Sequence, residues 1–154
     1  MNLSMKTLLA LCLLAPAAPA LAQGGAFTPE DLIRMRQGLM LGQKTQVGLL
    51  ADWAKHAAAP DERAATWAAN LAALARVVPI GFGEASQDTK AVKTAAKPEI
   101  WKNAAEFKRR VTALQEETAK LAEIARKKDG PAFAKQYAAT TATCKACHDA
   151  FRNE

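Results

Sequence analysis

The sequence predicts an all-α protein whose helices form a bundle of four. Half of the residues are apolar but only 6% are aromatic. Alanine, the strongest helix former, recurs throughout, whereas the Val, Ile, Thr and Tyr that favour strands are sparse. Apolar residues return at close to a 3.6-residue period in four segments, joined by two short links and one long one. This arrangement is typical of a helix bundle.

The first 22 residues are predicted to be a cleaved secretory signal and not part of the fold. Lys6 precedes an apolar run over residues 8–14, and residues 20–22 read Ala-Leu-Ala, a small-residue cleavage site. The apolar run is too short to anchor a chain in a bilayer, and we expect no second apolar stretch in the mature chain that is long enough to span one. Cleavage leaves residues 23–154 as one domain. It lowers the net charge from +6 to +5 and leaves two of the three cysteines.

The first helix is expected from Thr28 to about Ala57. Thr28 can cap the helix, Pro29 suits its first position, and the two acidic residues that follow lie at the positive end of the helix dipole. The helix ends before Pro60. Its apolar residues at helical spacing are Leu32, Met35, Leu39, Val47, Leu50 and Trp53.

The second helix is expected from about Asp61 to Pro79. Its apolar side carries Ala64, Trp67, Ala68, Leu71, Leu74, Ala75 and Val78. Residues 79–97 have no sustained apolar period and are predicted to be a loop. Loops of this length inside a compact domain are often functional.

The third helix is expected from Pro98 to about Lys127, where basic residues complement the negative end of its dipole. Its inward positions are Ile100, Trp101, Ala104, Phe107, Val111, Leu114, Leu121 and Ile124. A tight turn at residues 129–131 leads to the fourth helix, from Ala132 to about Phe151.

One motif indicates the chemistry. Residues 144–148 read Cys-Lys-Ala-Cys-His, the C-x-x-C-H signature of c-type haem attachment. On a helix, positions i, i+3 and i+4 share a face, so Cys144, Cys147 and His148 converge. The two thiols can form thioethers with the haem vinyl groups, and His148 can be an axial ligand of the iron.

Three other interpretations of the motif are weaker. A structural zinc site needs four ligands, and the mature chain offers only one further histidine, His56. A thioredoxin-like redox pair belongs next to a βαβ unit, which this sequence lacks. A disulfide between cysteines three residues apart on a helix would bring little loop-closure benefit.

The position of the motif restricts the class of cytochrome. Only six residues follow His148 and none is Met or His, so a sixth iron ligand must come from earlier in the chain. This excludes the common small cytochrome c layout, in which the motif lies near the start. The order instead resembles the class II cytochromes c, cytochrome c-prime and its low-spin relatives. The resemblance is carried by three segments: residues 36–40 (Arg-Gln-Gly-Leu-Met), 97–101 (Lys-Pro-Glu-Ile-Trp) and 144–152 (Cys-Lys-Ala-Cys-His-Asp-Ala-Phe-Arg).

The resemblance implies an antiparallel four-helix bundle with one covalently attached haem c per chain, in the periplasm. It places Arg36 beside the haem propionates, Gln37 at the same polar rim, and Met40 at the distal position. It also implies that Phe82 and residues 97–100 close over the haem. The stretch before Phe82 lacks an aromatic residue that the family often has there.

Two functions follow from the resemblance, and they differ in one bond. In the low-spin relatives a Met at the position of Met40 is the sixth iron ligand, and Met/His ligation suits electron transfer. In cytochrome c-prime the distal side chain does not bind, and the open iron takes nitric oxide or carbon monoxide. We favour the electron carrier and keep gas binding as the alternative. An enzymatic role is not expected, because the chain offers no distal His for acid–base chemistry.

The net charge of the mature chain and the glycines of its first helix indicate which partners it could bind. The mature charge of +5 is either a solvated surface or a basic docking face near the haem edge, with Lys145 and Arg152 beside the motif, for acidic redox partners. Nucleic-acid binding is not expected. The resemblance implies a homodimer through the first two helices, where the glycines could permit close helix approach. These glycines are Gly38, Gly42 and Gly48.

Overall fold

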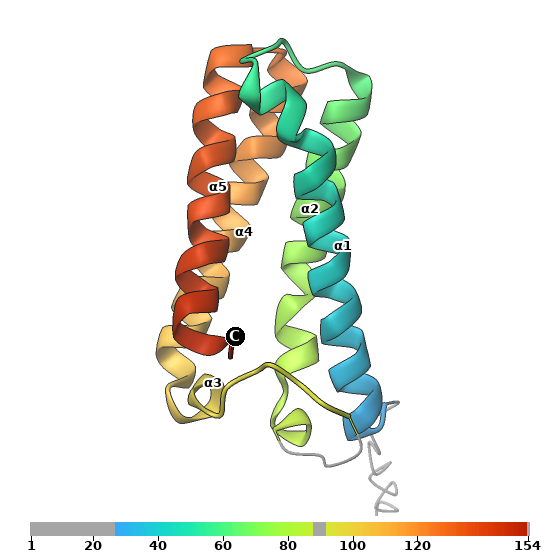
Figure 1. The fold of residues 1–154 in the computed structure, drawn as a ribbon, viewed down its shortest axis with the longest axis vertical. Coiled ribbons are helices and arrows are strands. Elements are labelled where there is room, and N and C mark those ends of the chain that lie inside the picture. The colour runs from blue at the N-terminus through green and yellow to red at the C-terminus, as the bar shows by residue number, and fades with distance from the viewer. Residues whose placement is uncertain (1–26, 88–91, 154) are drawn as a thin grey trace, which may run out of the picture.

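The computed structural model describes residues 27–87 and 92–153 and confirms the helical prediction (Figure 1). Its four long helices are α1 (Pro29–Lys55), α2 (Glu62–Val77), α4 (Ala104–Lys127) and α5 (Gly130–Phe151). They run alternately up and down, and α1 packs on α2 and α5 while α4 packs on the same two helices. The long connection between α2 and α4 crosses the end of the bundle at which α5 finishes (Figure 1). The predicted signal, residues 1–22, lies outside the described residues.

The predicted cap of the first helix forms, and α2 has a cap that was not predicted. The backbone N–H of Asp31 donates to Thr28 Oγ1 at 3.2 Å, and the backbone N–H of Thr28 donates back to the Asp31 carboxylate at 3.0 Å. This reciprocal pair is a capping box, which satisfies two otherwise unpaired N–H groups. Asp61 caps α2 in a similar way, because its carboxylate accepts from the backbone of Arg63 and Ala64 at 3.0 Å each.

The predicted loop over residues 79–97 is only partly correct. Pro79 does end the α-helical part of α2, but the chain continues in tighter turns as two short 3₁₀ helices, η1 (Val78–Phe82) and η2 (Glu84–Ser86). The third predicted helix is interrupted. A single turn, α3 (Glu99–Lys102), is separated from α4 by Asn103, whose backbone leaves the helical region at φ −123° and ψ 53°.

The turn into the last helix is tighter than predicted. The α5 helix starts at Gly130, two residues before the expected Ala132, because the Asp129 carboxylate accepts from the Ala132 N–H at 3.0 Å and caps it. A Cβ at position 130 would lie 2.1 Å from the carbonyl oxygen of Ala57. The link between α1 and α2 therefore packs directly on this turn, and only glycine leaves room for it.

The main cluster of the buried core draws residues from all four long helices. Its members are mostly small or aliphatic, which lets the helices approach closely: Leu50, Ala64, Ala68, Leu71, Ala72, Leu121, Ala122, Ala125 and Phe133. The predicted inward face of α1 is wrong near the start of the helix. Ile33 and Arg36 are buried there, whereas Leu32 and Met35 are not fully buried. The inward face is therefore one position away from the predicted one.

One apolar stretch was not expected. Glu62–Phe82, which covers α2 and η1, is long and apolar enough by length and composition to cross a membrane, with a mean hydropathy of 1.2. The prediction that the mature chain has no such stretch is therefore wrong. In this structure α2 packs against α1 and α4, and its buried side consists of bundle-core residues. We interpret the stretch as a bundle helix, because the core helix of a bundle can be just as long and apolar as a membrane span.

Candidate functional site

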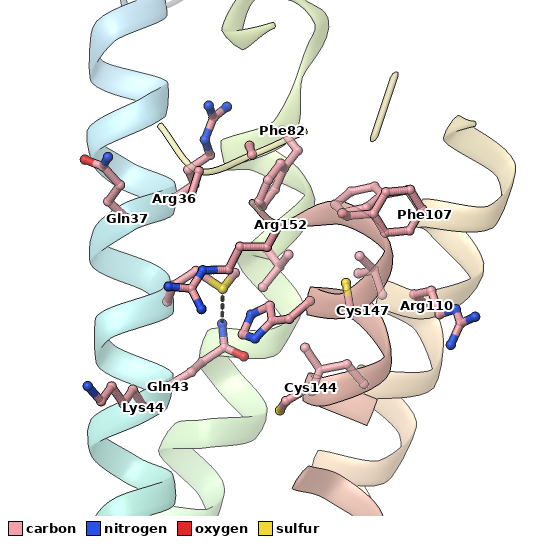
Figure 2. A pocket seen from close by; sticks show the side chains of 18 of the residues that line it. Arg36, Gln37, Gln43, Lys44, Phe82, Phe107, Arg110, Cys144, Cys147 and Arg152 are labelled. Carbon is pink, nitrogen blue, oxygen red and sulfur yellow. Dashed lines mark hydrogen bonds between the residues drawn. The ribbon is translucent and has the colours of Figure 1, made fainter. Parts of the chain in front are cut away.

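A cavity of about 540 Å³ lies between α1, α4, α5 and the long connection (Figure 2). Its volume falls in the range of cofactor and ligand pockets, about 300–1,000 Å³. It is lined by seven of the residues expected at the haem site: Arg36, Gln37, Met40, Phe82, Cys144, Cys147 and His148. The segment 97–100, which was also expected to close over the haem, is not among the lining residues. The long connection thus brings residues from distant parts of the sequence to one end of the bundle.

The motif lies on the last turns of α5 with its sulfur atoms available. Cys144 and Cys147 are both free thiols and half-buried. Burial raises the pKa of each thiol above its ordinary value. In the part of the chain that the structure describes, no group of three or more His, Cys, Asp or Glu side chains is placed to hold a bare metal ion. Two thiols on one helix face, beside an apolar cavity, suit covalent attachment of a large apolar group.

His148 presents its imidazole to the cavity. The residue is exposed and lines the cavity wall. Even so, desolvation by the surrounding protein, and secondarily the charge of Arg152, lower the pKa of His148, while Asp149 opposes the shift. The imidazole is therefore neutral at pH 7 and keeps a nitrogen lone pair for a metal.

The end of α5 is fastened to the segment that covers the cavity. The backbone N–H of Lys97 donates to Phe151 O at 2.9 Å, and that of Asn153 donates to Ala95 O at 2.7 Å. Ala96 and Arg152 form an isolated antiparallel bridge between these bonds. Ala95, Ala96 and Arg152 line the cavity themselves, so the same contacts fix the motif helix and the cavity wall.

Arg36 is buried, not solvated, with 3% of its surface exposed. One guanidinium nitrogen donates to the backbone oxygen and hydroxyl of Ser86 at 3.0 and 3.1 Å, and the other donates to Thr94 Oγ1 at 2.8 Å. The guanidinium also lies 5.3 Å from the Phe82 ring centre and 5.7 Å from that of Trp101. Burial lowers the pKa of Arg36, but an arginine stays charged. Arg36 thus ties α1 to the long connection.

The positive charge of Arg36 has no acidic partner among residues 27–87 and 92–153. The charged residues in the described lining of the cavity are all basic: Arg36, Lys44, Arg110 and Arg152. Of these, Arg110 is paired with Glu106 at 2.6 Å. An anionic group, such as a carboxylate, would offset the remaining charge at this rim. Sequence reasoning did not single out Lys44 or Arg110.

Gln37 and Phe82 occupy the edge of the cavity. Gln37 is exposed, and its amide donates to the carbonyl of Lys93 at 2.8 Å. The Phe82 ring packs 4.9 Å from Phe107, which lies 5.4 Å from Phe151 in an edge-to-face arrangement. Rings from α4 and α5 thus continue the aromatic contact of Phe82, which no local sequence pattern could reveal.

Met40 and Gln43 both line the cavity from α1. Figure 2 shows Gln43 on the α1 side of the cavity, with Cys144 and Cys147 on α5 across from it. Met40 is half-buried. Gln43, one turn further along, is 6% exposed. Its amide nitrogen lies 3.4 Å from Leu39 O and 4.0 Å from the Met40 sulfur. Sequence reasoning overlooked Gln43, although its spacing of three residues from Met40 was a usable signal.

Known proteins are similar to this chain over most of its length. The family model for cytochrome C' matches residues 31–152. Cytochrome c' of Alcaligenes xylosoxydans xylosoxydans is 31% identical over 126 residues, 82% of this chain and 96% of that protein. Cytochrome c-554 of Cereibacter sphaeroides is 34% identical over 151 residues, 95% of each chain.

Among solved structures, a ferrous variant of cytochrome c prime from Alcaligenes xylosoxidans with bound NO superposes with a TM-score of 0.74 at 28% identity. The match covers 82% of this chain and 97% of that one. The chain therefore belongs to the cytochrome c' family and is a four-helix bundle that carries covalently attached haem c.

Proposed function

We propose that the chain is a periplasmic electron carrier in which Met40 is the sixth ligand of the haem iron. The observation that carries the proposal is the placement of Met40. Its thioether lines the cavity from α1, while His148 lines the same cavity from α5. A haem attached at α5 would therefore have a sulfur donor available on its other side. Met/His ligation raises the reduction potential and suits electron transfer.

In this proposal, the C-x-x-C-H motif attaches the haem. Cys144 and Cys147 supply the thioether sulfurs, and the neutral imidazole of His148 supplies the proximal ligand. The free thiols and the lowered pKa of the histidine support these roles. When bound, haem supplies an iron that changes between the ferric and ferrous states. The signal over residues 1–22 takes the chain to the periplasm, where covalent attachment prevents loss of the cofactor.

The basic rim supports both cofactor and partner binding. Arg36, which has no carboxylate partner in the described chain, lies where a haem propionate could offset its charge, with Gln37 next to it. Arg152 also lines the cavity, and its charge can steer acidic redox proteins at low salt. Lys145 contributes less, because it is paired with Asp149 at 2.7 Å.

Gas binding remains the second candidate, and a specific observation favours it. The similar structure from Alcaligenes xylosoxidans holds NO. The cavity lining also includes the apolar residues Val47, Val111 and Leu114. If Met40 only packs there, the iron has an open position for a small gas. Neither function requires a catalytic acid or base, and we propose no enzymatic role.

We also propose a homodimer through the first two helices, α1 and α2, together with η1, which follows α2. Large apolar side chains are exposed there, with Leu41 at 65% and Ile80 at 54%. A Cβ at Gly38 or Gly48 would meet no atom within 4 Å, so both glycines are open to a partner. Gly42 instead faces its own chain, because a Cβ there would lie 3.2 Å from the Leu74 side chain, and it is not available for this contact.

The Met40 bond is tested by comparing the optical spectra of the wild type and Met40→Leu. A low-spin wild type and a high-spin variant are expected. Met35→Leu is the matched control, since Met35 lies on the same helix, is also half-buried, and does not line the cavity. A wild type that is already high-spin, and unchanged by Met40→Leu, would favour gas binding.

A further inference from the structure

Gln43 is a buried polar residue in a wall that packing alone would make apolar. It lies three residues after Met40, so both side chains share one face of α1. Only 6% of its surface is exposed, and it lines the cavity. Burying an amide is unfavourable unless hydrogen bonds replace those it made with water. The position therefore calls for a reason beyond filling space.

The contacts of the Gln43 amide point to one neighbour. Its nitrogen carries two N–H donors, and the two acceptors near it are Leu39 O at 3.4 Å and the Met40 sulfur at 4.0 Å. The dashed line in Figure 2 marks the second contact. The Leu39 carbonyl belongs to the helix backbone, and 3.4 Å is long for a bond to it. The second N–H is thus free to serve the thioether, which is a weak acceptor.

A methionine side chain that binds a metal must be kept in one conformation. Its side chain has three rotatable bonds and moves readily between conformations. Metal ligands are commonly oriented by hydrogen bonds from neighbouring side chains. A thioether sulfur has two lone pairs, so one can accept from an amide while the other binds iron.

We propose that Gln43 is a positioning residue for Met40: its amide N–H donates to the Met40 sulfur and holds the other lone pair toward the cavity. This inference rests on the proposed ligation by Met40. The donated hydrogen bond also withdraws electron density from the sulfur, which weakens its stabilisation of ferric iron. Gln43 therefore supports both the Fe–S bond and a raised reduction potential.

Two readouts follow on the purified holoprotein. Carbon monoxide binds ferrous iron only by displacing Met40, so Gln43→Leu raises the apparent affinity for the gas. A weak hydrogen bond corresponds to an increase of about three- to tenfold. The reduction potential falls in the same variant, because the sulfur donates more strongly or is bound for a smaller fraction of the time. A merely structural role would move neither quantity.

Two further variants keep the test decisive. Gln43→Asn retains a polar amide that is too short by one methylene to reach the sulfur, and is expected to behave like Gln43→Leu. Gln46→Leu is the matched control, because Gln46 lies on the same helix, does not line the cavity, and has a buried oxygen without a partner in the described chain. It is expected to leave the affinity and the potential unchanged.

The failures of the two proposals are distinguishable. If the wild type is low-spin and Gln43→Leu binds carbon monoxide as the wild type does, the inference is overturned and ligation by Met40 stands. An equal response of Gln46→Leu would overturn it as well. If the wild type is high-spin and Met40→Leu does not change its spectrum, Met40 does not bind the iron. The proposed positioning role of Gln43 is then refuted as well.

Discussion

The contact between Arg36 and the long connection makes a quantitative prediction for stability. Arg36→Met removes the guanidinium while keeping an unbranched side chain. The variant loses the hydrogen bonds that the guanidinium donates to Ser86 O at 3.0 Å and to Thr94 Oγ1 at 2.8 Å. Hydrogen bonds from a charged donor contribute about 1.5–3 kcal/mol each, which gives about 3–6 kcal/mol for the two.

The net loss is smaller than this sum. Burying a cation is itself unfavourable because it loses its hydration, and the variant is relieved of that cost. We therefore expect Arg36→Met to lower the free energy of unfolding by about 3 kcal/mol. For a domain of this size, the corresponding fall in Tm is about 10 °C.

The assay is thermal and guanidinium chloride unfolding of the holoprotein, followed by far-ultraviolet circular dichroism. Arg34→Met is the control, because Arg34 is exposed two residues earlier on the same helix, and its change is expected to stay within about 0.5 kcal/mol. Hydrogen exchange should also accelerate at the Ser86 amide, which bonds to Gly83 O at 2.9 Å within the tethered segment. If the Arg36 and Arg34 variants were equally stable, the tethering role of Arg36 would be refuted.

Three further predictions concern attachment, acid sensitivity and assembly. Cys144→Ala combined with Cys147→Ala leaves haem extractable by acidified organic solvent, and haem that stays bound would contradict attachment at the motif. Hydrogen bonds from Lys120 and Gln136 lower the pKa of Glu117, so its stabilisation is present at neutral pH and is lost as the pH falls below the ordinary glutamate range. Glu117→Gln therefore costs about 1 kcal/mol at pH 7 and less at about pH 3.5 in denaturant titrations, and an equal cost at both pH values would contradict this. Leu41→Lys converts a dimer to a monomer in sedimentation experiments, and an unchanged mass would place the interface elsewhere.

The sequence was sufficient for features that depend on local spacing. The helices follow from apolar periodicity, and the start of α1 follows from the cap at Thr28. The cavity residues of α5 follow from the C-x-x-C-H spacing, because three nearby positions on one helix share a face whatever surrounds them. Met40 was reached through the resemblance to class II cytochromes c, and it does line the cavity.

Features that depend on distant segments could not be read in this way. Arg36 is buried because Ser86 and Thr94, 50 and 58 residues later, supply its acceptors. No pattern around Arg36 indicates them. The aromatic wall of Phe82, Phe107 and Phe151 likewise combines three separate elements.

Two local predictions also failed, for physical reasons. The inward face of α1 was placed one position away from Ile33, since Leu32 and Met35 fit the apolar period as well. The break at Asn103 had only the modest helix propensity of Asn as a signal, which is too weak to end a helix by itself.

The central claim is that Met40 binds the iron, and the optical spectrum of the ferrous holoprotein with and without carbon monoxide tests it most directly. Sharp, split α and β bands and little response to the gas are the predicted result. A broad high-spin spectrum that changes strongly when the gas is added would contradict the claim. It would show that the distal position is open and that Met40 forms part of the cavity wall.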